Sequence, residues 1–205
     1  MFMYKKKSIE GMILVLGLLL LNSCATTEVT GEWRDTSYQQ PLKKVLVVGM
    51  SKSELRRHLF EDTMVKRLEA RGVAAVASST IMSKDEKIDK NTLEPLEKKD
   101  NFDALLVTRL VSVRREKYYV PGSYPPYPYY YNFYGYYSSI YPMVYEPGYL
   151  AQDTIVSLET NVYETQNEKL IWSIRTETFN PKNANKLVDD LSNVIVKQLA
   201  QAGLI

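Results

Sequence analysis

Apolar and polar residues along the chain form blocks that predict a strand, a helix and a second strand early in the domain. Residues 44–50 are a short continuous apolar run, the pattern of a strand covered on both faces. A helix is predicted over 54–71, because Ser53 is a good N-cap and Gly72 suits the position after the last turn. Residues 73–78 then predict a strand that pairs parallel to the first through a right-handed crossover.

The second half of the chain predicts a short helix near Pro95, three strands and a closing helix. Residues 154–164 and 170–179 alternate on either side of a polar turn and predict a hairpin. Asn183 precedes an amphipathic helix whose apolar face should lie on the sheet. The long strand predicted over 103–115 should place four apolar residues on one face: Leu105, Val107, Val111 and Val113.

This order of elements predicts an α/β (α+β) fold. The expected architecture is a mixed sheet of about five strands with two main helices packed against it. Residues 42–205 are predicted to form this single domain, with residues 116–152 as a Tyr/Pro-rich insertion.

The N-terminus has the parts of a bacterial secretory signal in order. Three lysines at 5–7 precede an apolar run over 12–21, which suits a signal core and falls short of the roughly 20 residues of a spanning helix. Residues 21–24, Leu-Asn-Ser-Cys, then resemble a lipobox, the signature of bacterial lipoproteins. The resemblance implies that residues 1–23 are a signal peptide and that Cys24 is acylated and anchors the protein in a membrane. A plain signal peptide and an uncleaved anchor are the alternatives.

The residues after the cysteine bear on location. Ala25 stands where an Asp retains enterobacterial lipoproteins in the inner membrane. Its presence predicts an outer-membrane lipid anchor with the domain facing the periplasm, and the inner membrane and the cell surface stay open as alternatives. Residues 24–41 are polar and aperiodic, so a tether between lipid and domain is expected.

Composition narrows the partners and the chemistry. The chain has 26 basic and 24 acidic residues, and without residues 1–23 it has 23 of each. A net charge near zero and a periplasmic address argue against a nucleic acid partner. Cys24 is the only cysteine, so no disulfide can form within the chain. With His58 as the only histidine, neither a metal site nor a cofactor is expected.

No catalytic site is predicted. His58 precedes Glu61 and Asp62 by three and four residues on the predicted helix, a spacing that favours a solvated face with ion pairs. The chain has no G-x-S-x-G nucleophile elbow, and residues 48–52 lack the glycines of a phosphate loop. Scattered carboxylates leave an envelope hydrolase as a third functional alternative.

The most unusual stretch runs from Tyr118 to Tyr149 and holds 13 of the 16 tyrosines and 6 of the 9 prolines. Prolines fix φ and remove backbone donors, so neither a helix nor a central strand is expected over 121–128, and the segment should be a long loop or an extended arm. Three interpretations stay open: a passive insertion, a contact surface, or insertion at a membrane interface. A contact surface would bind an envelope protein, peptidoglycan or a second copy of the chain. Its candidate residues are Tyr124, Tyr127, Tyr129, Tyr130, Tyr131, Tyr134, Tyr136 and Tyr137.

Three stretches resemble a family of uncharacterised bacterial envelope lipoproteins, known as a domain of unknown function. They are residues 30–35 (TGEWRD), residues 43–48 (KKVLVV) with 56–62 (RRHLFED), and the hairpin over 162–173. The arrangement is also similar to the α/β domains of the TolB N-terminal and curli-secretion lipoprotein type. The resemblance implies interaction and assembly roles in the envelope, and it brings no active site.

The sequence therefore predicts a lipid-anchored envelope protein with a non-catalytic binding or scaffolding role, in which the tyrosine-rich arm is the contact surface. The alternative is a subunit of an oligomeric envelope assembly or a secretion accessory, with sheet and arm packed between copies.

Overall fold

The computed structural model describes residues 27–82, 95, 100–122, 132–144 and 148–205. Its centre is a six-stranded sheet in the order β1-β6-β5-β4-β2-β3. The strands are β1 (Thr27–Arg34), β2 (Lys44–Met50), β3 (Ala74–Ala77), β4 (Ala104–Val120), β5 (Tyr149–Glu164) and β6 (Leu170–Phe179). Strand β2 is parallel to β3 and β4, and the other neighbours are antiparallel. The predicted mixed α/β fold is confirmed, with one strand more than expected.

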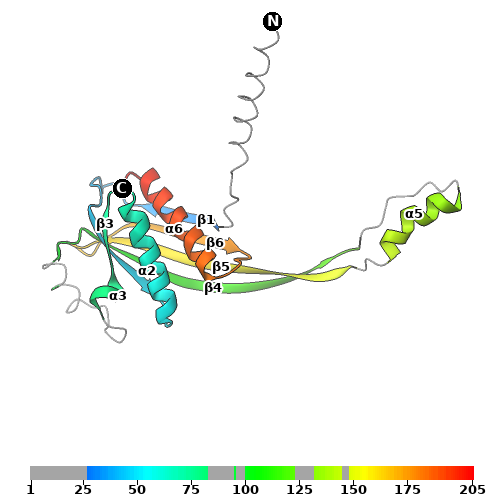
Figure 1. Cartoon of the computed structure of the whole chain (residues 1–205). Helices are drawn as coiled ribbons and strands as arrows, with labels where there is room; N and C mark the ends of the chain where they lie inside the picture. Colours follow the sequence, from blue (N-terminus) through cyan, green and yellow to red (C-terminus); the bar gives the residue numbers. More distant parts are fainter. Residues whose placement is uncertain (1–26, 83–94, 96–99, 123–131, 145–147) are drawn as a thin grey trace, which may run out of the picture.

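Two long helices cover one face of this sheet (Figure 1). Helix α2 (Glu54–Glu69) follows β2, and α6 (Ala184–Gln201) closes the chain. Two of the predicted end signals hold, because Gly72 has a φ of 82° and the Asn183 side chain accepts a hydrogen bond from the Lys186 backbone N–H. Ser53 stands at the N-cap position of α2, but its side chain makes no capping hydrogen bond. The largest fully buried apolar side chains between these helices and the sheet are Met64, Leu68, Leu106, Trp172, Ile174, Leu191, Ile195 and Leu199.

Among the described residues, the opposite face of the sheet is covered only near β2. There the short helix α3 (Ser78–Ile81) packs against a small apolar cluster centred on Leu46, Val48 and Phe102. The short helix predicted near Pro95 falls almost wholly outside the described residues. Within the described part of the chain, no helix is long and apolar enough to cross a bilayer.

Strand β1 corrects the expectation of a polar tether over residues 24–41. Seven of its residues pair with β6, and Thr27 Oγ1 lies 2.7 Å from Thr178 Oγ1. The indole N–H of Trp172 also donates to Glu32 across the same pair of strands. The strand has no apolar alternation because it lies at the edge of the sheet, where backbone pairing and polar side chains suffice.

The face of β4 also differs from the prediction. Ala104 and Leu106 face the main core and are fully buried, whereas Leu105 and Val107 pack against the smaller cluster on the other side. A register shift between Leu110 and Ser112 then interrupts the alternation. When a strand is apolar on both faces, its sequence does not indicate which face packs on the main core. The sequence of such a run also does not reveal a bulge.

A buried carboxylate ties the start of α2 to its neighbours. Glu61 is fully buried and accepts hydrogen bonds from the Gly49 N–H at 2.8 Å, the Ser78 hydroxyl at 2.7 Å and the Ser79 N–H at 2.8 Å. The Arg57 guanidinium lies 3.2 Å away on the same helix. Burial acts to raise the pKa of Glu61, but these hydrogen bonds outweigh it and hold the pKa below the usual 4.5.

Acid should destabilise the fold through such groups. The Lys169 and Ser37 side chains likewise lower the pKa of Asp35 to about 2. A carboxyl whose folded pKa is lowered adds stability that is complete above its unfolded pKa and is lost as pH falls through the folded value. We therefore expect the urea midpoint to be lower at pH 3 than at pH 6, and the difference to shrink in Glu61→Gln. Equal midpoints at both pH values in the unmodified chain would contradict this.

Candidate functional site

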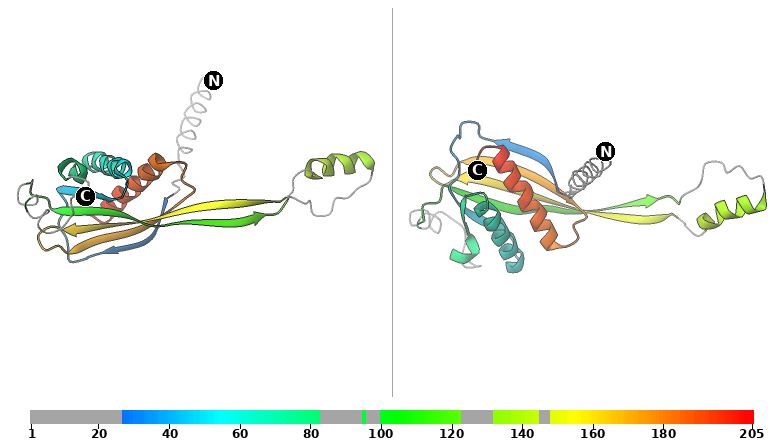
Figure 2. Two further views of the ribbon diagram at one scale, coloured as in Figure 1. Left: turned by 90° about the horizontal axis from the view of Figure 1, so that it is seen from below. Right: turned by 45° about the horizontal axis from the view of Figure 1, so that its top comes forward.

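A long ribbon leaves one end of the sheet. Strand β6 ends at Phe179, opposite Ile155, whereas β4 and β5 stay paired as far as Val120 and Tyr149. The residues beyond the sheet therefore form a two-stranded ribbon, and α5 (Phe133–Val144) lies past its end (Figures 1 and 2). We call the ribbon and α5 the arm. The sequence left a long loop and an extended arm open for this segment. Its described residues form an extended arm, and α5 was not expected.

Helix α5 displays an aromatic surface. Phe133, Tyr137 and Tyr141 follow one another at a spacing of four residues, with ring centroids 5.9 Å and 4.9 Å apart. Asn132 begins the helix, since its side chain accepts a hydrogen bond from the Gly135 N–H at 2.8 Å. Tyr134 is 81% exposed, so the helix presents its aromatic side chains to solvent rather than to the sheet.

The predicted tyrosine set divides in two. Tyr134, Tyr136 and Tyr137 lie exposed on α5. The other five predicted tyrosines lie outside the described residues: Tyr124, Tyr127, Tyr129, Tyr130 and Tyr131. The ribbon adds exposed side chains that the prediction omitted, namely Tyr118, Tyr119, Tyr149 and Leu150.

An apolar groove lies at the base of the arm. It opens between the first halves of α2 and α6, above β2, β4 and β5, and has a cavity volume of about 370 Å³. That volume is within the range of small-molecule sites. Its apolar walls include Met50, Leu59, Phe60, Leu110, Val113 and Leu187. The groove could not be predicted from a sequence motif, because its walls come from elements that are far apart in the sequence.

The face of β4, β5 and β6 opposite α2 and α6 carries a ladder of ion pairs. Glu159 accepts from Arg109 and from Arg175 at 3.1 Å, and Glu177 accepts from Arg114 at 3.1 Å. Burial acts to raise the pKa of Glu159, but the hydrogen bonds from both arginines prevail and lower it. Exposed pairs of this kind contribute little stability each. They give this face a solvated, charge-balanced surface.

The structure places His58 and Glu61 in different environments. His58 is exposed, and its Nε2 lies 3.4 Å from Glu54. The solvated face predicted for His58 is present, but the carboxylate beside the histidine is Glu54. Glu61 does not lie on that face and instead points into the core beside Arg57. Across the described residues no group of three or more His, Cys, Asp or Glu side chains could hold a metal ion. Cys24 lies outside the described residues.

Comparisons with known proteins give distant likenesses. No family model matches the sequence, and no curated protein matches it either. Among solved structures, the PelC dodecamer from Paraburkholderia phytofirmans is 12% identical with a TM-score of 0.44, covering 85% of this chain and 95% of that one. Lipoprotein GNA1162 from Neisseria meningitidis is 14% identical with a TM-score of 0.41, covering 78% and 99%. These matches establish no family and do not say what this protein binds.

Proposed function

We propose that this protein is a lipid-anchored envelope protein that faces the periplasm and acts by binding through its arm, without catalysis. The proposal rests first on the arm. A two-stranded ribbon on its own is marginally stable in water, and this one also exposes apolar and aromatic side chains. Tyr119 is 62% exposed and Leu150 is 74% exposed. Contiguous exposed apolar surface of this kind is typical of an interaction site.

The chemistry of the arm fits a protein or a glycan partner. Tyrosine combines a large rigid ring with a hydroxyl and loses little entropy when it is fixed in an interface. Phe133, Tyr134 and Tyr137 on α5 are exposed, and their rings supply contact area for an envelope protein or for the sugars of peptidoglycan. The lipobox-like Leu-Asn-Ser-Cys motif at 21–24 supports the location.

The first test removes the arm tip and keeps the fold. Val120 and Tyr149 are direct partners in the ladder, so residues 121–148 can be replaced by an Asn-Gly turn that closes the hairpin. We expect the mature chain, residues 24–205, to capture peptidoglycan or one envelope protein from solubilised envelopes. The shortened chain should capture neither. Far-UV circular dichroism and the melting temperature should stay close to those of the full arm.

A point-substitution version keeps the arm length. Phe133, Tyr134 and Tyr137 changed together to Ser should weaken capture, whereas Ser changes at Thr36 and Gln39, which are exposed in the β1–β2 connection, should not. Capture that is indifferent to both arm variants would show that the arm is a passive insertion.

A second candidate is a subunit of an oligomeric envelope assembly or secretion accessory. The observation in its favour is β1, an eight-residue strand at the edge of the sheet with mostly exposed side chains. Such an edge can pair with a strand of another chain. Sedimentation of the mature chain at increasing concentration separates the two candidates, since a monomer throughout would argue against the assembly.

A further inference from the structure

The groove at the base of the arm is lined by apolar side chains that remain open to water. Met50 is 59% exposed and Val113 is 50% exposed, although both line the groove. The deeper walls, Phe60 and Leu191, belong to the main core. The groove thus leads from solvent to the core between two helices, and its volume of about 370 Å³ is within the range of small-molecule sites.

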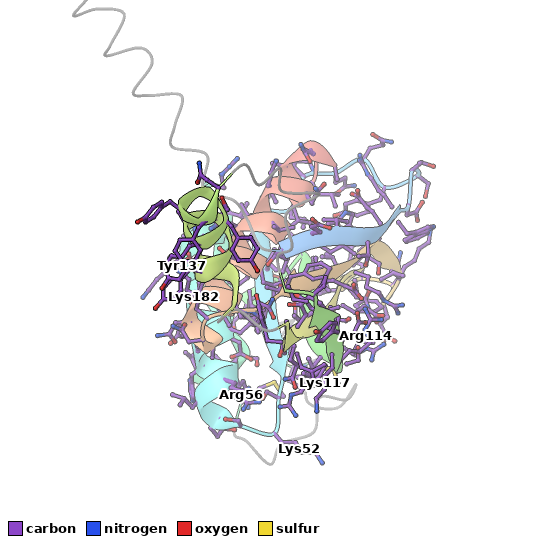
Figure 3. The ribbon with its side chains drawn as sticks, turned by 90° about the vertical axis from the view of Figure 1, so that its right-hand side faces the viewer. Lys52, Arg56, Arg114, Lys117, Tyr137 and Lys182 are labelled. Carbon is purple, nitrogen blue, oxygen red and sulfur yellow. The ribbon has the colours of Figure 1, made fainter. Side chains whose placement is uncertain are left out.

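Four exposed cations lie around this end of the molecule. Lys52 and Arg56 flank the start of α2, Lys182 precedes α6, and Lys117 lies on the ribbon. Figure 3 views the molecule from the arm end and shows these four side chains. Within the described part of the chain none of them has a carboxylate at ion-pair distance.

The two faces of the ribbon carry different charged side chains. Ser157 and Arg114 both contact Glu177, which places Arg114 on the open face of the sheet. Alternation then puts Val113, Arg115 and Lys117 on the other face, the one that the helices cover. The carboxylate of Glu116 lies with Arg114, at 3.9 Å. The side of the ribbon that continues from the groove therefore carries cations and no carboxylate between Val113 and Tyr119.

The start of β1 lies at the same end of the molecule. Thr27 pairs with Thr178, which precedes the connection that contains Lys182. Cys24 is three residues before Thr27, and three extended residues span about 10 Å at most. If Cys24 carries the proposed lipid, the groove and its cations open within reach of the phospholipid headgroups.

We propose that the groove binds one acyl chain of an anionic phospholipid, whose phosphate is held by Arg56, Lys117 and Lys182. The apolar walls recognise the chain through burial of its surface, and the three cations select an anionic headgroup. The site comprises the groove and the nearby ribbon residue Lys117, and it does not include the arm tip. This inference goes beyond the proposed function. Only one of its arguments, the one from the position of Cys24, rests on the proposed function.

The test uses the mature chain of residues 24–205 with Cys24→Ser, which contains every described element. Dodecyl phosphate supplies the phosphate and the chain of such a lipid without a bilayer. Dodecyl maltoside supplies the same chain with a neutral head, and inorganic phosphate supplies the head alone. Calorimetric titrations below the micelle concentrations should show dodecyl phosphate binding about tenfold more tightly than the maltoside, and no binding of inorganic phosphate.

Two sets of variants separate head from chain. The first variant combines Arg56→Gln, Lys117→Gln and Lys182→Gln, and it should bind dodecyl phosphate only as tightly as the maltoside. A matched triple variant, at exposed cations of the opposite end of the molecule, should leave both affinities unchanged. The matched residues are Lys43, Lys66 and Lys197. Val113→Phe should weaken both detergents by filling the groove, whereas Val111→Phe, at an exposed position that does not line it, should not.

Three results would overturn the inference. They are no binding of dodecyl phosphate, equal affinity for both detergents, and affinities unchanged by Val113→Phe. If no detergent binds and Val113→Phe instead dissociates an oligomer, a second copy fills the groove and the lipid assignment is wrong. The chain with residues 121–148 replaced by Asn-Gly keeps the groove and all three cations, so it should still bind dodecyl phosphate. Failure of arm binding and failure of lipid binding are thereby distinguishable.

Discussion

Replacing Glu61 by Ala should lower the free energy of unfolding by roughly 3–5 kcal/mol, the usual result of breaking a buried ion pair from one side. The change removes the acceptor for the Gly49 N–H, the Ser78 hydroxyl and the Ser79 N–H. It also leaves Arg57 buried with only Ser78 and the more distant Glu54 as partners. Urea unfolding followed by circular dichroism at pH 7 measures the loss.

Two variants control this prediction. Glu69→Ala removes an exposed carboxylate from the same helix and should change the free energy by less than about 0.5 kcal/mol. Arg57→Met combined with Glu61→Leu removes both charges and should be less destabilising than Glu61→Ala alone, because no buried charge is left unpaired. A double variant as unstable as the single one would show that the hydrogen bonds from Ser78 and Ser79 matter more than the charge pair.

Replacing Trp172 by Ala should also cost roughly 3–5 kcal/mol, because a large cavity would open in the centre of the sheet. Trp172 is fully buried beneath the helices, and its neighbours across the strands are Val162 on β5 and Arg34 on β1. The change also removes the donor to Glu32, which helps to hold the edge strand. Thermal and urea unfolding, compared with the unmodified chain, measure the loss.

The second tryptophan is the matched control. Trp33 on β1 is 49% exposed, so Trp33→Ala should cost about 1 kcal/mol. Trp172→Phe should fall between the two, since it retains most of the volume but not the indole donor. A loss of less than about 1 kcal/mol in Trp172→Ala would show that β1 and β6 do not depend on this side chain.

Helices and paired strands were predictable where local chemistry is decisive. The N-cap at Asn183 and the left-handed Gly72 are properties of single residues and their immediate neighbours, and both mark helix ends in the structure. The hairpin of β5 and β6 was predictable because alternation and a polar turn define it within one stretch of chain. These signals do not depend on what the rest of the chain does.

Other features depended on contacts between distant segments. Strand β1 forms because it pairs with the edge of β6. The sequence Thr27–Arg34 by itself does not indicate that such a partner strand is available. Helical spacing placed Glu61 beside His58, but only the packing of α2 on β2 and α3 shows that Glu61 points inward. The groove likewise needs two helices to diverge above three strands.

By itself, the sequence determined the order and kind of most elements, the mixed sheet and the position of the aromatic insertion, since these follow from periodicity, caps and composition over short stretches. The tertiary structure decided which face of β4 is buried, that the insertion stands on a paired ribbon, and that cations lie beside an apolar groove. The physical reason is that burial and electrostatic pairing are properties of residues brought together by folding, and positions such as Arg56 and Lys117 are 61 residues apart along the chain.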